Sequence, residues 1–277
     1  MPTLPTTVGL LPPRHRGAVV DTLAVCLLAF FATGYFVLAG ADIGTGMVLP
    51  YLGGSDGERR LVIASFAPFF LGNEVWLVAT AGVLVGCFPV LEGELLSAQF
   101  TVVVALVAGW MVRDAGLWLR GRGGGLRWRA GCDGAVVGGS WAVALSWGWL
   151  LAALFAGTPE RTATAPVGAV TALAVAALFV AHGLGFAGLR LTGRPWSRAH
   201  RLVGRTGPGR SFALTAVLMG ALPLFAGPAL DPSAHTADGA TLTLLVPVLL
   251  AFCPLLVAAQ AWTWHTFRHR VTRPSYL

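Results

Sequence analysis

The chain has few charged residues and no lysine. Asp, Glu, Lys and Arg together make up 11% of its 277 residues, whereas an ordinary soluble domain carries about 25%. A soluble chain of this length would need a charged surface that this sequence does not provide. All basic residues other than histidine are arginines, and we attach no mechanism to the missing lysine.

Motifs of soluble enzymes are absent as well. The sequence has no P-loop, no HExxH pair and no dinucleotide-binding glycine pattern with its downstream acid. Cys26, Cys87, Cys132 and Cys253 lie in or beside apolar segments without CxxC spacing, which is typical of small buried residues rather than of metal sites or disulfides. The arginines fall between apolar segments, so we expect no nucleic acid partner despite the basic charge.

What the sequence has instead is long apolar stretches. A helix needs about 20 mostly apolar residues to cross a bilayer. Stretches of this kind lie near 18–38, 62–88, 95–117, 132–155, 166–188, 211–229 and 240–264. We therefore predict an all-α fold, a polytopic membrane helical bundle of about seven transmembrane helices that forms one domain over 1–277.

The arginines are distributed unequally between the two sides of such a bundle. With seven spans, sixteen arginines lie on one side, and only Arg14, Arg16 and Arg161 lie on the other. The positive-inside rule assigns the arginine-rich side to the cytoplasm. We expect an N-terminus outside, with 1–16 as an irregular exterior tail, and a cytoplasmic C-terminus, with 268–277 as its tail. The basic loops could touch anionic lipid, but we interpret them as solvated.

Three polar residues inside the apolar stretches are candidates for function. An ionisable side chain at bilayer depth costs at least about 2.5–3.5 kcal/mol. If one helix runs from Leu61, Glu74 lies about 13 residues in, or roughly 20 Å deep. Asn73 stands beside it, and Asp42 lies near the cytoplasmic end of the first span. We predict a proton path through Asp42, Asn73 and Glu74; the alternative is a neutral Glu74 bonded to a neighbouring helix.

Other polar residues in the spans are interpreted structurally. Arg113 and Asp114 are adjacent, so we expect them to point apart and find separate partners, with Arg113 extending to the membrane surface. A lone His182 is expected to bond a neighbouring helix rather than to bind haem. Trp76 and His182 are candidates for packing or for contact with a partner.

Two segments carry a resemblance to a known family. Residues 34–47 read GYFVLAGADIGTGM, and residues 72–78 read GNEVWLV. They resemble the GY-x-VLDGFDLG-x-G and P-x-WDGNEVWL motifs of subunit II of cytochrome bd-type quinol oxidases. The similarity covers about 34–100, including Pro68 and Phe88-Pro89, and extends more weakly to 260–268.

The resemblance implies a haem-bearing subunit I as partner, which holds the haems and the main quinol site. The complex would oxidise quinol and reduce dioxygen in a prokaryotic plasma (inner) membrane, in contact with lipid. This chain would bind no haem itself, and would support subunit I and supply a cytoplasmic proton route. Asp42, Asn73, Glu74 and Trp76 match the family motifs.

The chain departs from those motifs at three positions. Ala39 and Leu71 stand where the family has Asp, and Phe70 stands where it has Trp. The chain is also about one helix pair shorter than the usual subunit. We therefore interpret it as a divergent, shortened member. The alternatives are a transporter or proton-conducting membrane protein and a non-catalytic scaffold paralogue.

Overall fold

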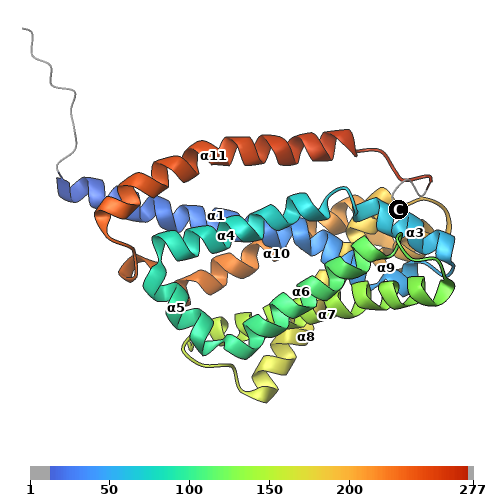
Figure 1. Ribbon diagram of the computed structural model, residues 1–277, viewed down its shortest axis with the longest axis horizontal. Helices are drawn as coiled ribbons and strands as arrows, with labels where there is room; N and C mark the ends of the chain where they lie inside the picture. Colours follow the sequence, from blue (N-terminus) through green and yellow to red (C-terminus); the bar gives the residue numbers. More distant parts are fainter. Residues whose placement is uncertain (1–12, 274–277) are drawn as a thin grey trace, which may run out of the picture.

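The computed structural model describes residues 13–273, which are helical with no strand in that range (Figure 1). The α-helices are α1 (Pro13–Met47), α2 (Leu49–Leu52), α3 (Asp56–Phe66), α4 (Phe70–Cys87), α5 (Pro89–Ala98), α6 (Phe100–Leu119), α7 (Leu126–Phe155), α8 (Ala165–Arg190), α9 (Gly193–Val203), α10 (Pro208–Ala226) and α11 (Gly239–Thr266). Three 3₁₀ turns join them, η1 (Gly204–Thr206), η2 (Gly227–Leu230) and η3 (Pro232–Ala234).

Within residues 13–273, seven helical segments are long and apolar enough to cross a membrane. They are Gly17–Met47, Phe70–Cys87, Phe100–Leu119, Leu126–Phe155, Ala165–Arg190, Pro208–Leu230 and Gly239–Thr266. The all-α fold and the number of spans are therefore confirmed. The described chain starts and finishes at opposite ends of the bundle (Figure 1), as an odd number of crossings requires.

Residues 1–12 and 274–277 of the two predicted tails lie outside the described residues. Helix α1 begins at Pro13, so the last four residues of the predicted irregular tail 1–16 are helical. At the other end, α11 ends at Thr266, and 268–273 continue without a helix.

The predicted second span, 62–88, is two helices rather than one. Helix α3 ends at Phe66, and α4 begins at Phe70. Pro68 lies in the break; a proline lacks the backbone N–H and clashes with the preceding turn of a helix. The N–H of Phe69 closes the turn by donating to the carbonyl of Phe66 at 2.8 Å. Glu74 therefore lies in the second turn of its helix, not deep in a long one.

The segment around Glu92 and Glu94 is helix α5. Pro89 occupies its first turn, where a proline's fixed φ favours helix and no N–H is needed. The chain then bends at Gln99 into α6. The third span accordingly begins five residues later than the predicted boundary of 95.

Helix α1 is the central helix of the bundle and runs nine residues past its predicted end at 38. It packs against α4, α7, α8, α10 and α11. Its glycines do not break it; they allow close packing. Gly44 lies so close to α8 that a Cβ there would meet the carbonyl oxygen of Phe179 and the backbone nitrogen of Gly183. Small residues at helix contacts let backbones approach in this way.

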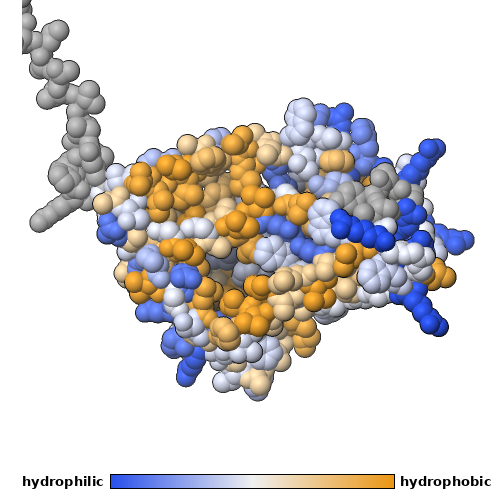
Figure 2. Space-filling model, in the orientation of Figure 1, coloured by the Kyte–Doolittle hydropathy of each residue, from blue (hydrophilic) through white to orange (hydrophobic). Residues whose placement is uncertain are grey.

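Charge and apolar surface are separated along the bundle. In Figure 2, hydrophilic residues gather at the end where α1 ends and α4 begins, and the sides are mostly hydrophobic on this face. This is the end that bears the loops with most arginines. The bundle thus has the surface of a multi-pass membrane protein with one strongly basic end.

Candidate functional site

A buried arginine gathers three carboxylates between α1, α4 and α6. The side chain of Arg113 on α6 is only 2% exposed. Its Nη2 donates to Asp42 on α1 at 2.5 Å, and its Nη1 lies 2.9 Å from Asp114 and 3.4 Å from Glu74 on α4. We call Arg113 with Asp42, Glu74 and Asp114 the Arg113 cluster.

The three helices bring these groups to one level. Glu74 lies four residues after the start of α4, Asp42 five before the end of α1 and Arg113 six before the end of α6. At about 1.5 Å per residue, each is roughly 6–9 Å from its helix end. The depth of roughly 20 Å for Glu74 assumed one helix from Leu61, and that assumption fails because the helix is broken at Pro68.

An amide chain extends the cluster to α11. The Asn73 Nδ2 donates to Asp42 Oδ2 at 2.7 Å and to the carbonyl of Leu38 at 3.0 Å. Gln260 on α11 donates from Nε2 to Asn73 Oδ1 at 2.9 Å, and Trp76 Nε1 donates to Gln260 Oε1 at 3.4 Å. The structure thus brings the three predicted residues Asp42, Asn73 and Glu74 together and links them to Trp76.

The cluster becomes more accessible from α1 towards α6. The Asp42 side chain is 3% exposed, that of Glu74 is 13% exposed and that of Asp114 is 21% exposed. Trp110, one turn before Arg113, donates from Nε1 to Glu74 Oε1 at 2.8 Å. Asp42 is therefore sealed inside the bundle, whereas Glu74 and Asp114 reach its side.

Two sequence interpretations of α6 were wrong. Arg113 does not extend to the membrane surface but is buried, and it bonds its neighbour Asp114. The long flexible arginine stem lets adjacent residues meet even though their Cβ atoms diverge. Arg113, Trp110 and Gln260 were missed as site residues; the available signals were an Arg-Asp pair in an apolar span and a lone amide in the last one.

The three residues that depart from the family motifs add no charge to the cluster. Ala39 is 2% exposed and packs in the apolar core. Leu71 is 48% exposed on the outside of α4. The guanidinium of Arg113 lies 5.8 Å from the ring centre of Phe70, a distance at which a cation is attracted to an aromatic face.

His182 joins three helices and has no nitrogen free for haem iron. Its Nε2 lies 2.9 Å from the carbonyl of Val37 on α1, and its Nδ1 lies 2.8 Å from the hydroxyl of Thr215 on α10. A carbonyl can only accept, so Nε2 carries the proton and Nδ1 accepts from Thr215. His182 makes the helix–helix bonds expected of it.

An apolar cavity of about 550 Å³ lies beside the cluster, bounded by α1, α4, α6, α7 and α10. Its walls include Leu77, Leu106 and Val143. Figure 2 shows a hollow on the face between α4 and α6. Trp110 lines this cavity and also bonds Glu74, so the apolar space meets the polar cluster at this side chain.

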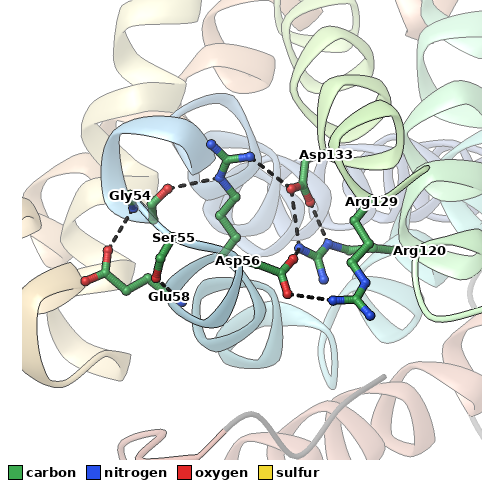
Figure 3. A network of polar contacts seen from close by, with 9 residues as sticks. Gly54, Ser55, Asp56, Glu58, Arg120, Arg129 and Asp133 are labelled. Carbon is green, nitrogen blue, oxygen red and sulfur yellow. Dashed lines mark hydrogen bonds and ion pairs between the residues drawn. The ribbon is translucent and has the colours of Figure 1, made fainter. Parts of the chain in front are cut away.

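A second ionic network joins helix ends at the basic end of the bundle (Figure 3). Asp133 on α7 accepts from Arg120 Nε at 2.6 Å and from Arg59 at 3.3 Å. Asp56, at the start of α3, accepts from Arg120 at 2.8 Å and from Arg129 at 3.0 Å. These bonds hold α3 against the end of α6 and the start of α7.

Glu58 connects the same region to α9. It accepts from Arg198 at 2.6 Å and from the backbone N–H of Gly54 at 2.8 Å. The bond from Arg198, followed by the one from Gly54, holds the pKa of Glu58 below its ordinary value. Partial burial alone would raise the pKa of Asp56, but hydrogen bonds and charge from Arg120, then Arg129, outweigh burial and lower it.

Acid should therefore weaken the basic end. A carboxylate with a lowered folded pKa adds stability above its unfolded pKa, about 3.9 for Asp and 4.3 for Glu, and this is lost as pH falls through the folded value. We expect Asp56→Asn with Glu58→Gln to lower stability at pH 7 by about 0.2–1 kcal/mol per partly exposed pair.

Thermal unfolding in detergent between pH 7 and pH 3 measures this effect. The double variant should approach the wild type in stability below about pH 4, whereas Glu94→Gln, an exposed change on α5, should follow the wild-type curve. Equal pH dependence of the double variant and the wild type would contradict the assignment.

Metal ligation finds no support in the described part of the chain. Residues 13–273 contain no group of three or more His, Cys, Asp or Glu side chains that could hold a metal ion. His182, the histidine deepest in the bundle, uses both ring nitrogens within the protein. His182 is therefore not available as a haem ligand.

Comparison with known proteins identifies the family. The sequence model described as cytochrome bd terminal oxidase subunit II matches residues 20–267. The chain is 29% identical over 266 residues to the cytochrome bd ubiquinol oxidase subunit 2 of Bacillus subtilis (strain 168), covering 89% of this chain and 75% of that protein.

Other relatives match a shorter stretch. The chain is 32% identical over 133 residues to the cytochrome bd-I ubiquinol oxidase subunit 2 of Escherichia coli (strain K12), covering 48% of this chain and 35% of that protein. A probable cytochrome oxidase subunit 2 of Haemophilus influenzae is 29% identical over 133 residues, again covering 48% and 35%. Because the family match reaches into all seven spans, this chain belongs to the cytochrome bd terminal oxidase subunit II family.

Proposed function

We propose that this chain is the haem-free companion of a haem-bearing subunit I in a prokaryotic plasma-membrane quinol oxidase. Family membership implies a complex with a subunit I, and the Bacillus and Escherichia relatives are named as subunits of ubiquinol oxidases. His182 is committed to bonds within the bundle, which supports placing the haem in the partner. Haem in subunit I would carry the electrons from quinol to dioxygen.

We assign proton exchange in this chain to the Arg113 cluster. One guanidinium faces three carboxyl groups, so full ionisation would leave two uncompensated negative charges beside an apolar cavity. Uncompensated charge in a low-dielectric site is costly. The cluster is therefore suited to hold protons and to exchange them, and reduction of dioxygen to water consumes protons. This charge imbalance is the single observation that carries the proposal.

The carboxyl groups of the Arg113 cluster have different roles in this proposal. Asp42 has the shortest bond to Arg113, accepts a second bond from Asn73 and is sealed from the surface. Glu74 has the longest contact with Arg113 and lies nearer the side of the bundle. The bonded route from Asp42 to Glu74 runs through Arg113, whose guanidinium does not release protons in proteins. We assign proton exchange to Glu74 with Asp114, and the positioning of Arg113 to Asp42 with Asn73.

The accessible side of the cluster suggests where subunit I packs. Carboxyl groups do not persist against lipid tails unless they face protein or water. Glu74 and Asp114 are partly exposed, and neighbouring apolar residues on α4 and α6, such as Val78 and Met111, are exposed as well. A partner over this face would cover both, so we place subunit I against α4 and α6.

Glu74→Gln tests the proton assignment in the intact complex. The amide keeps the size of the side chain and can still accept from Trp110, but it cannot carry an exchangeable acid proton. We expect quinol oxidase turnover to fall at least about tenfold, with the haem absorbance of the copurified complex unchanged. Oxygen consumption with a soluble quinol, normalised to haem, measures it.

Glu94→Gln on α5 is the matched control, because it makes the same chemical change at an exposed site away from the cluster. Full turnover in Glu74→Gln at unchanged haem content would overturn the assignment and leave this chain as a scaffold. Failure of haem to copurify with the wild-type chain would contradict the companion role itself.

A further inference from the structure

A second cavity, of about 430 Å³, lies at the basic end of the bundle. It is bounded by the end of α8, by Ala64 and Pro68 at the break before α4, and by the segment Thr266 to Arg273 that follows α11. The basic groups on its walls are Arg190, His269, Arg270 and Arg273. Among residues 13–273, no aspartate or glutamate lines it.

Arg190 is buried in this wall without a counterion among the described residues. The residue is 5% exposed, and its Nε is buried with no hydrogen-bond partner in the described chain. Its guanidinium carbon lies 5.1 Å from the ring centre of Phe69. Within residues 13–273, no carboxylate forms an ion pair with it. The other deeply buried arginines, Arg113 and Arg120, each bond at least two carboxylates.

The backbone around Arg190 is held in place by the C-terminal segment. The N–H of Val271 donates to the carbonyl of Arg190 at 2.8 Å, and the Thr192 hydroxyl donates to the carbonyl of Val271 at 2.8 Å. Arg270, beside Val271, lies 5.9 Å from the ring centre of Trp196 on α9. The cavity is thus a built feature between the end of α8, the break before α4 and the segment after α11, and Trp196 on α9 supports that segment through Arg270.

A buried, unpaired cation is costly, and an anion in the cavity would offset the cost. Guanidinium groups match the oxygens of a phosphate in a bidentate geometry. Thr266 and Thr272 line the same space, and Pro68, Phe267 and Val271 give it an apolar side. A ligand with a phosphodiester and an apolar portion fits this combination.

We propose that this cavity binds the headgroup of an anionic phospholipid, with the phosphodiester at the Arg190 guanidinium. The cavity opens beside the ends of two spanning helices, α8 and α11, on the arginine-rich side. Lipid headgroups lie near the ends of spanning helices, and basic pockets between such helices bind anionic headgroups. The proposal does not depend on the proton assignment, because Arg190 and the Arg113 cluster share no bond.

Native mass spectrometry of the solubilised complex tests the site. The wild type is incubated with phosphatidylglycerol or phosphatidylcholine, and the retained lipid is counted. We expect preferential retention of phosphatidylglycerol, and a drop of about tenfold in Arg190→Gln. Arg201→Gln, an exposed change on α9, is the matched control and should retain lipid as the wild type does. Arg270→Gln serves if Arg190→Gln does not fold, and should also weaken retention.

Three results would overturn the proposal. One is that Arg190→Gln retains as much phosphatidylglycerol as the control Arg201→Gln. If Arg190→Gln does not fold, the same comparison is made between Arg270→Gln and Arg201→Gln. Another is displacement of the retained lipid by millimolar inorganic phosphate, which would make free phosphate the ligand. A third is retention that appears only after removal of residues 274–277, which would make the chain's own end the occupant.

Discussion

Replacing Arg113 with leucine is expected to lower the free energy of unfolding by about 3–5 kcal/mol, as removal of one partner from a buried ion pair does. The substitution leaves Asp42 buried with Asn73 as its remaining side-chain partner. It also leaves Glu74 and Asp114 facing each other without the guanidinium that separates them. Thermal or SDS-induced unfolding of the solubilised protein measures the loss, and the yield of monodisperse protein should fall with it.

Two further substitutions distinguish charge from geometry. Arg113→Lys keeps the charge but lacks the fork that reaches Asp42 and Asp114 together, so we expect an intermediate loss. Arg122→Leu, at an exposed arginine in the turn after α6, should change stability by no more than about 0.5 kcal/mol.

A double variant tests whether the loss of stability comes from a buried carboxylate left without its counterion. Adding Asp42→Asn to Arg113→Leu removes the most deeply buried carboxylate, so part of the stability should return, and the two changes should not be additive. If Arg113→Leu unfolds like Arg122→Leu, or if Asp42→Asn only adds to its loss, the cluster does not hold α1, α4 and α6 together.

The number and order of the spans could be predicted because hydropathy is a local property. Each spanning helix needs about 20 mostly apolar residues regardless of its neighbours. Helix boundaries depended on single residues and contacts. Pro68 splits the predicted span 62–88, and its effect could have been anticipated from the missing N–H. The extension of α1 through Gly44 could not, because the close approach of Gly44 to the backbone of α8 exists only once the helices are packed.

Part of the candidate site could be predicted from the sequence. Asp42, Asn73 and Glu74 stand out as polar residues among apolar ones, and they do meet. Arg113 was assigned to the surface because it lies near a helix end, where a long side chain can escape. Which way it turns depends on three carboxylates supplied by α1, α4 and its own neighbour. That information exists only once the helices are packed.

The burial of Arg190 could not be predicted from the sequence either. In the sequence it is one of several arginines beside a basic loop, and a solvated arginine is the ordinary interpretation. Its burial follows from the segment after α11, which returns to bond the Arg190 carbonyl. Pairing over such a distance in the chain leaves no mark in local composition.

Gly183→Ala is expected to lower the stability of the bundle strongly, because it disrupts the contact between α1 and α8. A Cβ at Gly183 would lie 2.2 Å from the carbonyl carbon of Gly44 and 2.2 Å from the nitrogen of Thr45. Both atoms are backbone and cannot rotate away, so the helices must separate. Overpacking of this kind typically costs about 1–3 kcal/mol, and occasionally more. Thermal unfolding in detergent measures the loss.

The separation should also reach the Arg113 cluster, because Asp42 lies two residues before Gly44 on the same helix. We expect Gly183→Ala to reduce turnover of the complex as well as stability. Gly138→Ala is the control, since no atom lies within 4 Å of a Cβ at that position on α7; there an alanine should be neutral or add about 0.5–1 kcal/mol. If both alanines behave alike, α1 and α8 are not in direct backbone contact, and the position of Asp42 is set by something else.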